Sequence, residues 1–222
     1  MNRFINMLLL VLLFPTMFLT LYVCFDLPIG FLKTTGAHLP YKFELFLGLG
    51  LLLFVINLRR SIRRWMGMRI VSKKKKFKWN APVSASRKKR VITYLLLESL
   101  VMSFVGFSLY RLSDQAWMPA IAFLFGATDN IIFAIIGIKR NLYRIGLSSK
   151  ALIVADRDVT LLYFTGLRKV SIHQQSIYFD YIKGLQLSFP SDCIEEENRS
   201  EFFALLEAQL DKDRVFFSKT LT

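Results

Sequence analysis

Four long apolar runs constrain what this chain can fold into more than any other feature of its sequence. They cover residues 4–25, 41–58, 91–110 and 117–138. Each run is about 18–22 residues long, and a helix needs roughly 20 residues to cross the ~30 Å hydrocarbon core of a bilayer. We therefore predict a four-helix transmembrane domain over residues 1–140.

The first run could also be a cleaved signal peptide, because it follows Arg3. Its apolar stretch is longer than the core of a signal peptide, and no small residues spaced for cleavage follow it. Val23 is bulky at the position where a lipoprotein cleavage site, indicated by "LYVC", requires a small residue. We expect an uncleaved anchor helix that bends at Pro15.

The formal net charge of +14 is confined to one connector between the second and third runs. From Leu58 to Val91 the chain has 14 Lys or Arg and no Asp or Glu, and its other 16 basic residues are balanced by 16 acidic ones. The loops at 26–40 and 111–116 carry one basic residue each. Short loops rich in Lys and Arg stay in the cytoplasm. We predict a multi-pass protein of the bacterial inner (plasma) membrane, with both termini and the connector, residues 59–90, inside the cell.

The connector has three interpretations: a marker of topology alone, a contact for anionic lipid of the inner leaflet, and a nucleic-acid site. Leu58, Ile62, Met66 and Ile70 recur at helical spacing, with Trp65 beside them and arginines largely around the other side. Such a helix would continue from the second span and lie at the headgroup level, with Trp65 as an interfacial anchor. Each Lys or Arg beside an anionic leaflet is worth ~1 kcal/mol.

Nucleic-acid binding is the least favoured of these interpretations. Only Phe77 and Trp79 offer rings for stacking, and no recognisable nucleic-acid-binding module surrounds them. The candidate membrane-surface residues are Arg59, Arg60, Arg63, Arg64, Trp65, Lys73, Lys74, Lys75, Lys76, Lys78, Arg87, Lys88, Lys89 and Arg90.

Glu98 stands inside the third apolar run, and Asp129 and Asn130 stand inside the fourth. Counted from the basic ends of their runs, Glu98 lies about 12 Å and Asp129 about 15 Å deep, at 1.5 Å per residue. Antiparallel helices joined by a short loop are usual neighbours. We therefore expect the two carboxyls at similar height, and, if they are close, one of them protonated at neutral pH.

Two roles are open for Glu98, Asp129 and Asn130. A carboxylate at the bilayer centre costs at least ~2.5–3.5 kcal/mol, so these residues should face the bundle interior or water. With Ser99 and Ser103 they can form interhelical hydrogen bonds that fix packing. Alternatively they line a proton or ion path, although the interior of the runs contains no Lys, Arg or His as a counter-ion. Small residues in the third and fourth runs also favour contacts between copies, so we expect a homo-oligomer.

From residue 141 the pattern changes to short runs rich in Val, Ile, Tyr and Phe, separated by Gly, Pro and Asp. Alternation of apolar and polar residues, as in "VSIH" and "LQLSF", predicts five or six antiparallel strands. Asn198 and Glu201 predict a capping box at the start of a final helix. The apolar face of that helix comprises Phe202, Phe203, Leu206 and Leu210. We predict a small cytoplasmic α+β domain over residues 141–222.

The segment Tyr143–Leu210 carries a resemblance to a known family. Its parts are a strand pair in "YRIGLSSKALIVADRDVTLLYF", further strands in "LRKVSIHQQSIYFDYIKGLQLSF" and the closing helix "SEFFALLEAQL". In this order they resemble a bacterial pleckstrin-homology-like domain of the kind appended to small multi-pass membrane proteins. The resemblance implies a docking or oligomerising module with a strand edge and a helix groove for partners. It does not imply phosphoinositide recognition, because no Lys/Arg pocket surrounds Lys150 or Arg168.

The sequence contains no Gly-rich phosphate loop, no nucleophile–base set and no zinc spacing, so we predict no enzyme activity, cofactor or metal site. We predict a non-enzymatic scaffold or sensor that anchors a cytosolic protein partner through its C-terminal domain. The layout also resembles membrane subunits of multi-component bacterial assemblies, including antiphage defence complexes such as Kiwa. The alternative is a small transporter or channel that uses Glu98 and Asp129 for the passage of protons or ions.

Overall fold

The computed structural model describes residues 2–30, 33–173, 175–211 and 215–218. The chain forms two compact units. The first combines Met1–Arg63 with Tyr94–Ala134, and the second combines Arg64–Thr93 with Ile135–Thr222. Each unit is therefore built from two separate stretches of sequence.

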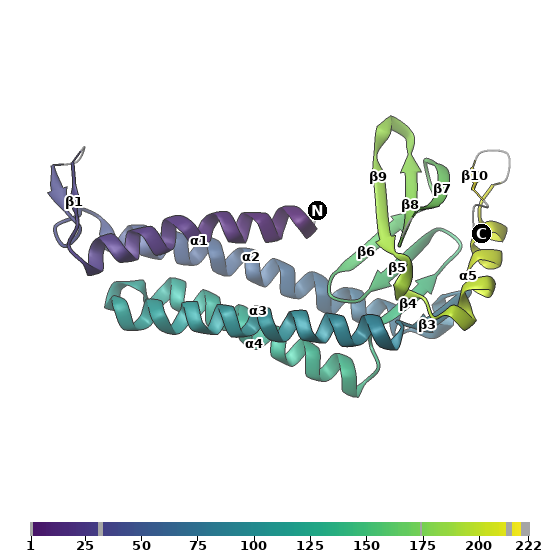
Figure 1. Ribbon diagram of the computed structural model, residues 1–222, viewed down its shortest axis with the longest axis horizontal. Helices are drawn as coiled ribbons and strands as arrows, with labels where there is room; N and C mark the ends of the chain where they lie inside the picture. The colour runs from purple at the N-terminus through teal and green to yellow at the C-terminus, as the bar shows by residue number, and fades with distance from the viewer. Residues whose placement is uncertain (1, 31–32, 174, 212–214, 219–222) are drawn as a thin grey trace. The chain divides into compact units, whose positions relative to one another are not determined.

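Four helices supply the first unit, and three of them run on into the second (Figure 1). They are α1 (Asn2–Cys24), α2 (Lys42–Val71), α3 (Ala85–Leu112) and α4 (Trp117–Lys139). All four are long and apolar enough to cross a membrane, as predicted. The helices α2 and α3 extend well beyond their apolar runs, because Arg and Lys favour helix nearly as much as Leu does.

Short elements join these helices. The strands β1 (Pro28–Ile29) and β2 (Thr34–Thr35) form an antiparallel pair between α1 and α2. A single 3-10 turn, η2 (Asp114–Ala116), separates α3 from α4. Because this connection is short, α3 and α4 are antiparallel neighbours.

Apolar and small side chains fill the interior of the first unit. Phe46 and Leu53 of α2, Leu109 of α3 and Ala120 of α4 are buried. Large apolar side chains also cover the outside, and Phe104 of α3 is 71% exposed. Soluble proteins rarely expose apolar surface this extensively, whereas lipid accepts it.

The described residues of the second unit form two four-stranded sheets, which confirms that an α+β region follows the helices. The first sheet has the order β3–β4–β5–β6, with strands Trp79–Pro82, Arg144–Leu147, Ala151–Ala155 and Val159–Tyr163. The second has the order β10–β7–β8–β9, with strands Phe216–Phe217, Leu167–His173, Ser176–Tyr181 and Gln186–Pro190. Neighbouring strands are antiparallel except for β10 and β7, which are parallel.

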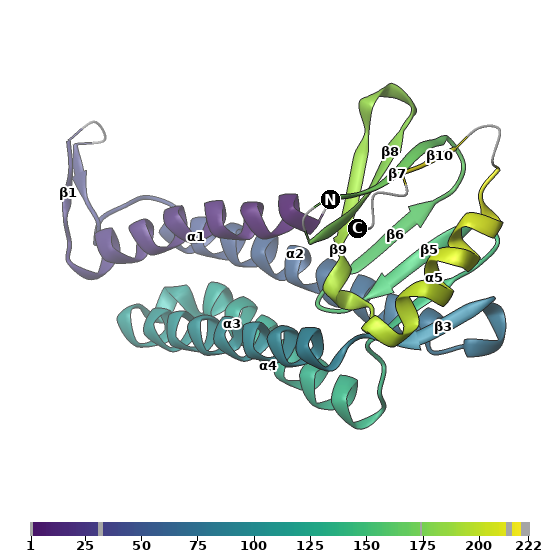
Figure 2. The same cartoon turned by 45° about the vertical axis from the view of Figure 1, so that its right-hand side comes forward.

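The helix α5 (Glu196–Gln209) closes this unit (Figure 2). Its Phe202 ring contacts Trp79 of β3, with 5.1 Å between ring centroids, and Phe189 of β9 at 6.4 Å. Of the predicted apolar face, Phe202 and Leu206 are buried, as is Leu210 at the C-cap, and Phe203 is partly buried. The predicted capping box is wrong. The helix begins at Glu196, ahead of Asn198, and its N-cap makes no side-chain hydrogen bond.

The connector, which we predicted as a loop, consists largely of helix and strand. Its first part is the end of α2, its last part is the start of α3, and η1 (Lys74–Lys76) and β3 lie between them. The strand β3 pairs with β4, with Trp79 opposite Leu147 and Pro82 opposite Arg144. The sequence pattern missed β3 because its four residues, "WNAP", include an Asn and a Pro, which are depleted in strands.

The transition from α4 to β4 is a helix-ending turn centred on Asn141. This residue has φ 49°, in the left-handed region that Asn tolerates better than most residues. The Leu142 N–H donates to the Gly137 carbonyl at 3.0 Å, and the Asn141 N–H donates to Ile138 at 3.2 Å. This pattern satisfies the last carbonyls of the helix and directs the chain into the sheet.

Candidate functional site

The helices of the first unit enclose an ion pair between Arg60 of α2 and Glu98 of α3. Both terminal guanidinium nitrogens of Arg60 donate to the Glu98 carboxylate, Nη1 to Oε1 and Nη2 to Oε2, the latter at 3.0 Å. The Arg60 side chain is 5% exposed and the Glu98 side chain 24%. A bidentate pair of this kind satisfies two charges that would otherwise be costly to remove from water.

The second intramembrane carboxyl has a different contact on α2. The Ser61 hydroxyl donates to Asp129 Oδ1 at 2.8 Å. We predicted that Glu98 and Asp129 would lie at similar height on the neighbouring helices α3 and α4. In the structure α2 provides a hydrogen-bond donor to each carboxyl, Arg60 to one and Ser61 to the other.

Further interhelical hydrogen bonds surround these contacts. The Ser99 hydroxyl of α3 donates to the Ala127 carbonyl of α4 at 2.8 Å, and the Asn57 amide of α2 donates to the Ala122 carbonyl at 3.4 Å. Asn130 is buried, with its amide 3.9 Å from the Met102 sulfur. Hydrogen bonds from Ser and Asn across helices stabilise packing in lipid. Asn57, Arg60, Ser61, Glu98, Ser99, Asp129 and Asn130 form the polar cluster.

Small residues let the helices approach near this cluster. A Cβ added at Gly126 would lie 3.1 Å from the Asn57 side chain, and one added at Gly106 would lie 2.9 Å from Leu124. Because the cluster and these close contacts occur together, the geometry fits a packing role for the polar residues.

Arg60 and Arg64, two of the residues that we predicted at a membrane surface, are both buried in the protein. A counter-ion for Glu98 is therefore present, on the segment that we assigned to the connector. Sequence periodicity could have found it. Asn57, Arg60, Ser61 and Arg64 recur at helical spacing and make one polar stripe on α2.

The apolar side chains predicted at helical spacing in this part of α2 are exposed. Leu58, Ile62, Met66 and Ile70 are between 37% and 57% exposed. The continuation of the second span as a helix is thus confirmed, and its exposed apolar face is the one that the spacing predicted. Its position relative to headgroups stays a prediction.

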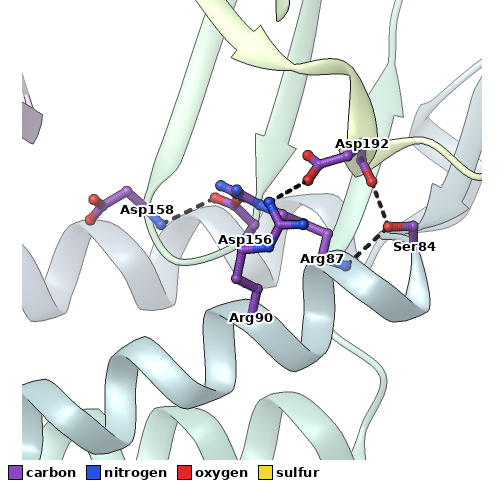
Figure 3. A network of polar contacts seen from close by, with 6 residues as sticks. All are labelled: Ser84, Arg87, Arg90, Asp156, Asp158 and Asp192. Atoms are coloured by element: carbon purple, nitrogen blue, oxygen red, sulfur yellow. Dashed lines mark hydrogen bonds and ion pairs between the residues drawn. The ribbon is translucent and has the colours of Figure 1, made fainter. Parts of the chain in front are cut away.

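In the second unit, polar contacts tie the start of α3 to the sheet region (Figure 3). Arg87 Nη2 donates to Asp156 Oδ2 at 2.7 Å, and Arg87 Nε donates to the same oxygen at 3.0 Å. The Ser84 hydroxyl donates to the Asp192 carbonyl oxygen, and Arg90 pairs with the Asp192 carboxylate at 2.9 Å. Burial raises the pKa of Asp156, and the charge of Arg87 opposes this rise.

Two glycines lie at close contacts between the other helix ends and the β3–β4–β5–β6 sheet region. Gly67 of α2 lies against Val159 of β6, and a Cβ there would come within 2.0 Å of the Val159 side chain. Gly137 of α4 lies against the Tyr143 ring, at 2.5 Å by the same measure. The ends of α2, α3 and α4 within the second unit are therefore all joined to its sheets.

The remaining predicted membrane-surface residues fall into two groups by exposure. Arg63, Trp65, Arg87 and Lys88 are partly buried. The exposed residues are Arg59, Lys73, Lys74, Lys75, Lys76, Lys78, Lys89 and Arg90. Some arginines of the basic run thus form ion pairs within the protein, whereas most of its lysines are exposed.

Other chemistry is sparse in the described part of the chain. Its residues include no group of three or more His, Cys, Asp or Glu placed to hold a metal ion. Cys193 is buried, and burial raises the pKa of its thiol, so little of the reactive thiolate forms. Comparison of the chain with protein-family models, with curated proteins and with solved structures found no match.

Proposed function

We propose that this protein is a non-enzymatic membrane scaffold or sensor that recruits a cytosolic protein through its C-terminal unit. In this proposal it lies in the bacterial inner membrane, with both termini and the connector in the cytoplasm. The proposal rests on one observation above the others. The second unit incorporates the ends of three helices that are long and apolar enough to cross a membrane.

This attachment matters physically because of conformational entropy. A domain on one flexible linker samples many orientations, and binding a partner must restrict them. Here Gly67–Val159, Arg87–Asp156 and Gly137–Tyr143 join the sheets to three helix ends. A partner bound to this unit would be connected to the membrane through three helices rather than through one linker.

The strand order supports the proposed pleckstrin-homology-like docking module. The strands β3 to β6 follow one another in one antiparallel sheet, β7 to β9 in the next, and α5 closes the unit. Within the described residues, β9 is the last strand of its sheet, so a strand of a partner could pair with its outer edge. Leu185, which directly precedes β9, is 54% exposed, and Tyr163, at the end of β6 in the other sheet, is 56% exposed.

Site-specific photocrosslinking in cells tests the proposal. A photoreactive amino acid at Leu185 or Tyr163 should yield one discrete cytosolic adduct. The same residue at Tyr41, 75% exposed between α1 and α2, should not. The captured protein, once purified, should bind the reconstituted full chain. Absence of an adduct at all C-terminal positions would contradict the scaffold.

A flux measurement separates the scaffold from the transporter or channel. In proteoliposomes the full chain should carry no proton or ion flux that depends on Glu98 or Asp129. A flux abolished by Asp129→Asn, with partner binding unchanged, would overturn the proposal. It would assign the polar cluster to transport.

A further inference from the structure

The exposed lysines of the connector form a surface turn between α2 and β3. We call residues 73–78 the lysine turn. It contains Lys73, Lys74, Lys75, Lys76 and Lys78, and all five are exposed. No acidic residue stands between Leu58 and Val91 in the sequence, and in the described part of the chain none of these lysines forms an ion pair.

The turn is held at its C-terminal side by the sheet. The Phe77 ring lies against Gly146 of β4, where a Cβ would come within 2.6 Å of it. The Lys78 N–H donates to the Leu147 carbonyl at 2.8 Å, and Trp79 is buried against Phe202. The Asn80 amide donates back to Val71, the last residue of α2, at 2.9 Å. The five lysines therefore stand on an ordered backbone.

We propose that the lysine turn is a binding site for the anionic headgroups of the phospholipid bilayer. The turn joins α2 to the segment that leads into α3, and both helices are long and apolar enough to cross a membrane. Its five positive charges complement phosphate, and cations next to a span are drawn to an anionic leaflet. The exposed apolar stripe of Leu58, Ile62, Met66 and Ile70 leads along α2 toward the turn.

The structure favours lipid over nucleic acid as the source of phosphate. Binding of single strands combines basic residues with exposed rings on which bases stack. Phe77 and Trp79 are the rings beside these lysines, and Trp79 is 7% exposed while Phe77 packs on Gly146. A bilayer surface requires only charge, which the turn provides.

The proposal assigns different roles to the lysines and to the buried arginines of the basic run. It is independent of the scaffold function. The lysines of the turn bind headgroups, whereas Arg60 and Arg87 are engaged by Glu98 and Asp156 inside the protein. Neutralising the turn should change lipid preference without unfolding. Loss of Arg87 should affect the fold without a selective effect on lipid.

The test uses the full chain in nanodiscs with stepped ratios of phosphatidylglycerol to phosphatidylcholine at constant ionic strength. Spin-labelled lipids report the preference of the protein-bound layer for each headgroup. The variant Lys74→Gln/Lys75→Gln/Lys76→Gln should lose at least about fivefold of the anionic preference, which is the effect of one juxtamembrane lysine. The matched control Lys150→Gln/Arg168→Gln/Lys169→Gln removes three charges elsewhere in the second unit and should retain it.

Several outcomes would overturn the proposal. Equal loss in both variants would show a general charge effect. Unchanged preference in the turn variant would exclude the site. The variant Lys74→Arg/Lys75→Arg/Lys76→Arg keeps the three positive charges. If it lost the preference for anionic lipid, that preference would depend on the packing of the lysine side chains and not on charge, which would contradict the proposal. Competition by inorganic phosphate alone, or tighter binding of a single-stranded oligonucleotide, would assign the turn to another ligand.

Discussion

At the scale of single residues, the Arg60–Glu98 pair is the contact that most affects how the helices associate. We expect Arg60→Gln and Glu98→Gln each to destabilise the first unit by about 1–3 kcal/mol. This is below the 3–5 kcal/mol of a fully buried pair, because Glu98 keeps some exposure. The double variant Arg60→Met/Glu98→Leu should cost less than either single change, since no uncompensated charge remains.

Unfolding of the purified chain in mixed micelles with increasing denaturing detergent measures these energies. The control is Arg59→Gln, because Arg59 neighbours the pair in sequence but is exposed. Additive effects of the two single changes would show that Arg60 and Glu98 do not stabilise each other.

At the scale of elements, the attachment of α3 to the sheet depends on Arg87. Asp156 is 10% exposed in its side chain and Arg87 is 18%. We expect Arg87→Ala to destabilise the second unit by about 2–4 kcal/mol at neutral pH, because a buried carboxyl loses its counter-charge. The matched control is Arg90→Ala. Arg90 is 50% exposed, so its pair with Asp192 is worth at most ~1 kcal/mol.

The Arg87→Ala defect should also depend on pH. Burial already raises the pKa of Asp156, and loss of Arg87 removes the influence that lowers it. A carboxyl with a raised folded-state pKa destabilises the folded state when it is ionised and not when it is protonated. The variant should therefore be closest to the parent stability below the unfolded pKa and lose stability as pH rises through the folded value. Thermal unfolding at a series of pH values checks this, and a defect of constant size would contradict it.

The elements also show where sequence patterns succeed and fail. The four long helices and the apolar face of α5 were predictable, because each follows from periodicity and length within one segment. The strand β3 was not, because it is a strand only through pairing with β4, some 60 residues later. The same holds for Arg60. Its spacing on α2 is visible in the sequence, but its pairing with Glu98 depends on how α2 and α3 pack.

At the scale of the whole molecule, the second unit should not fold from residues 141–222 alone. Without the connector, β4 loses its partner β3, and Phe202 loses the Trp79 ring. Asp156 also loses Arg87. We expect the fragment 141–222 to lack cooperative thermal unfolding and to show poorly dispersed amide resonances.

Restoring the missing strand should restore much of the fold. A fragment in which residues 77–84 are joined by a short Gly/Ser linker to residues 141–222 can re-form the β3–β4 pair, because Pro82 lies opposite Arg144. It should gain amide dispersion and a cooperative transition, with Lys78 and Val83 amides protected by their bonds to Leu147 and Tyr143. The same joined fragment with Trp79→Ser should gain neither amide dispersion nor a cooperative transition. If residues 141–222 fold cooperatively by themselves with the same stability as the joined fragment, then the connector only borders that unit and is no part of it.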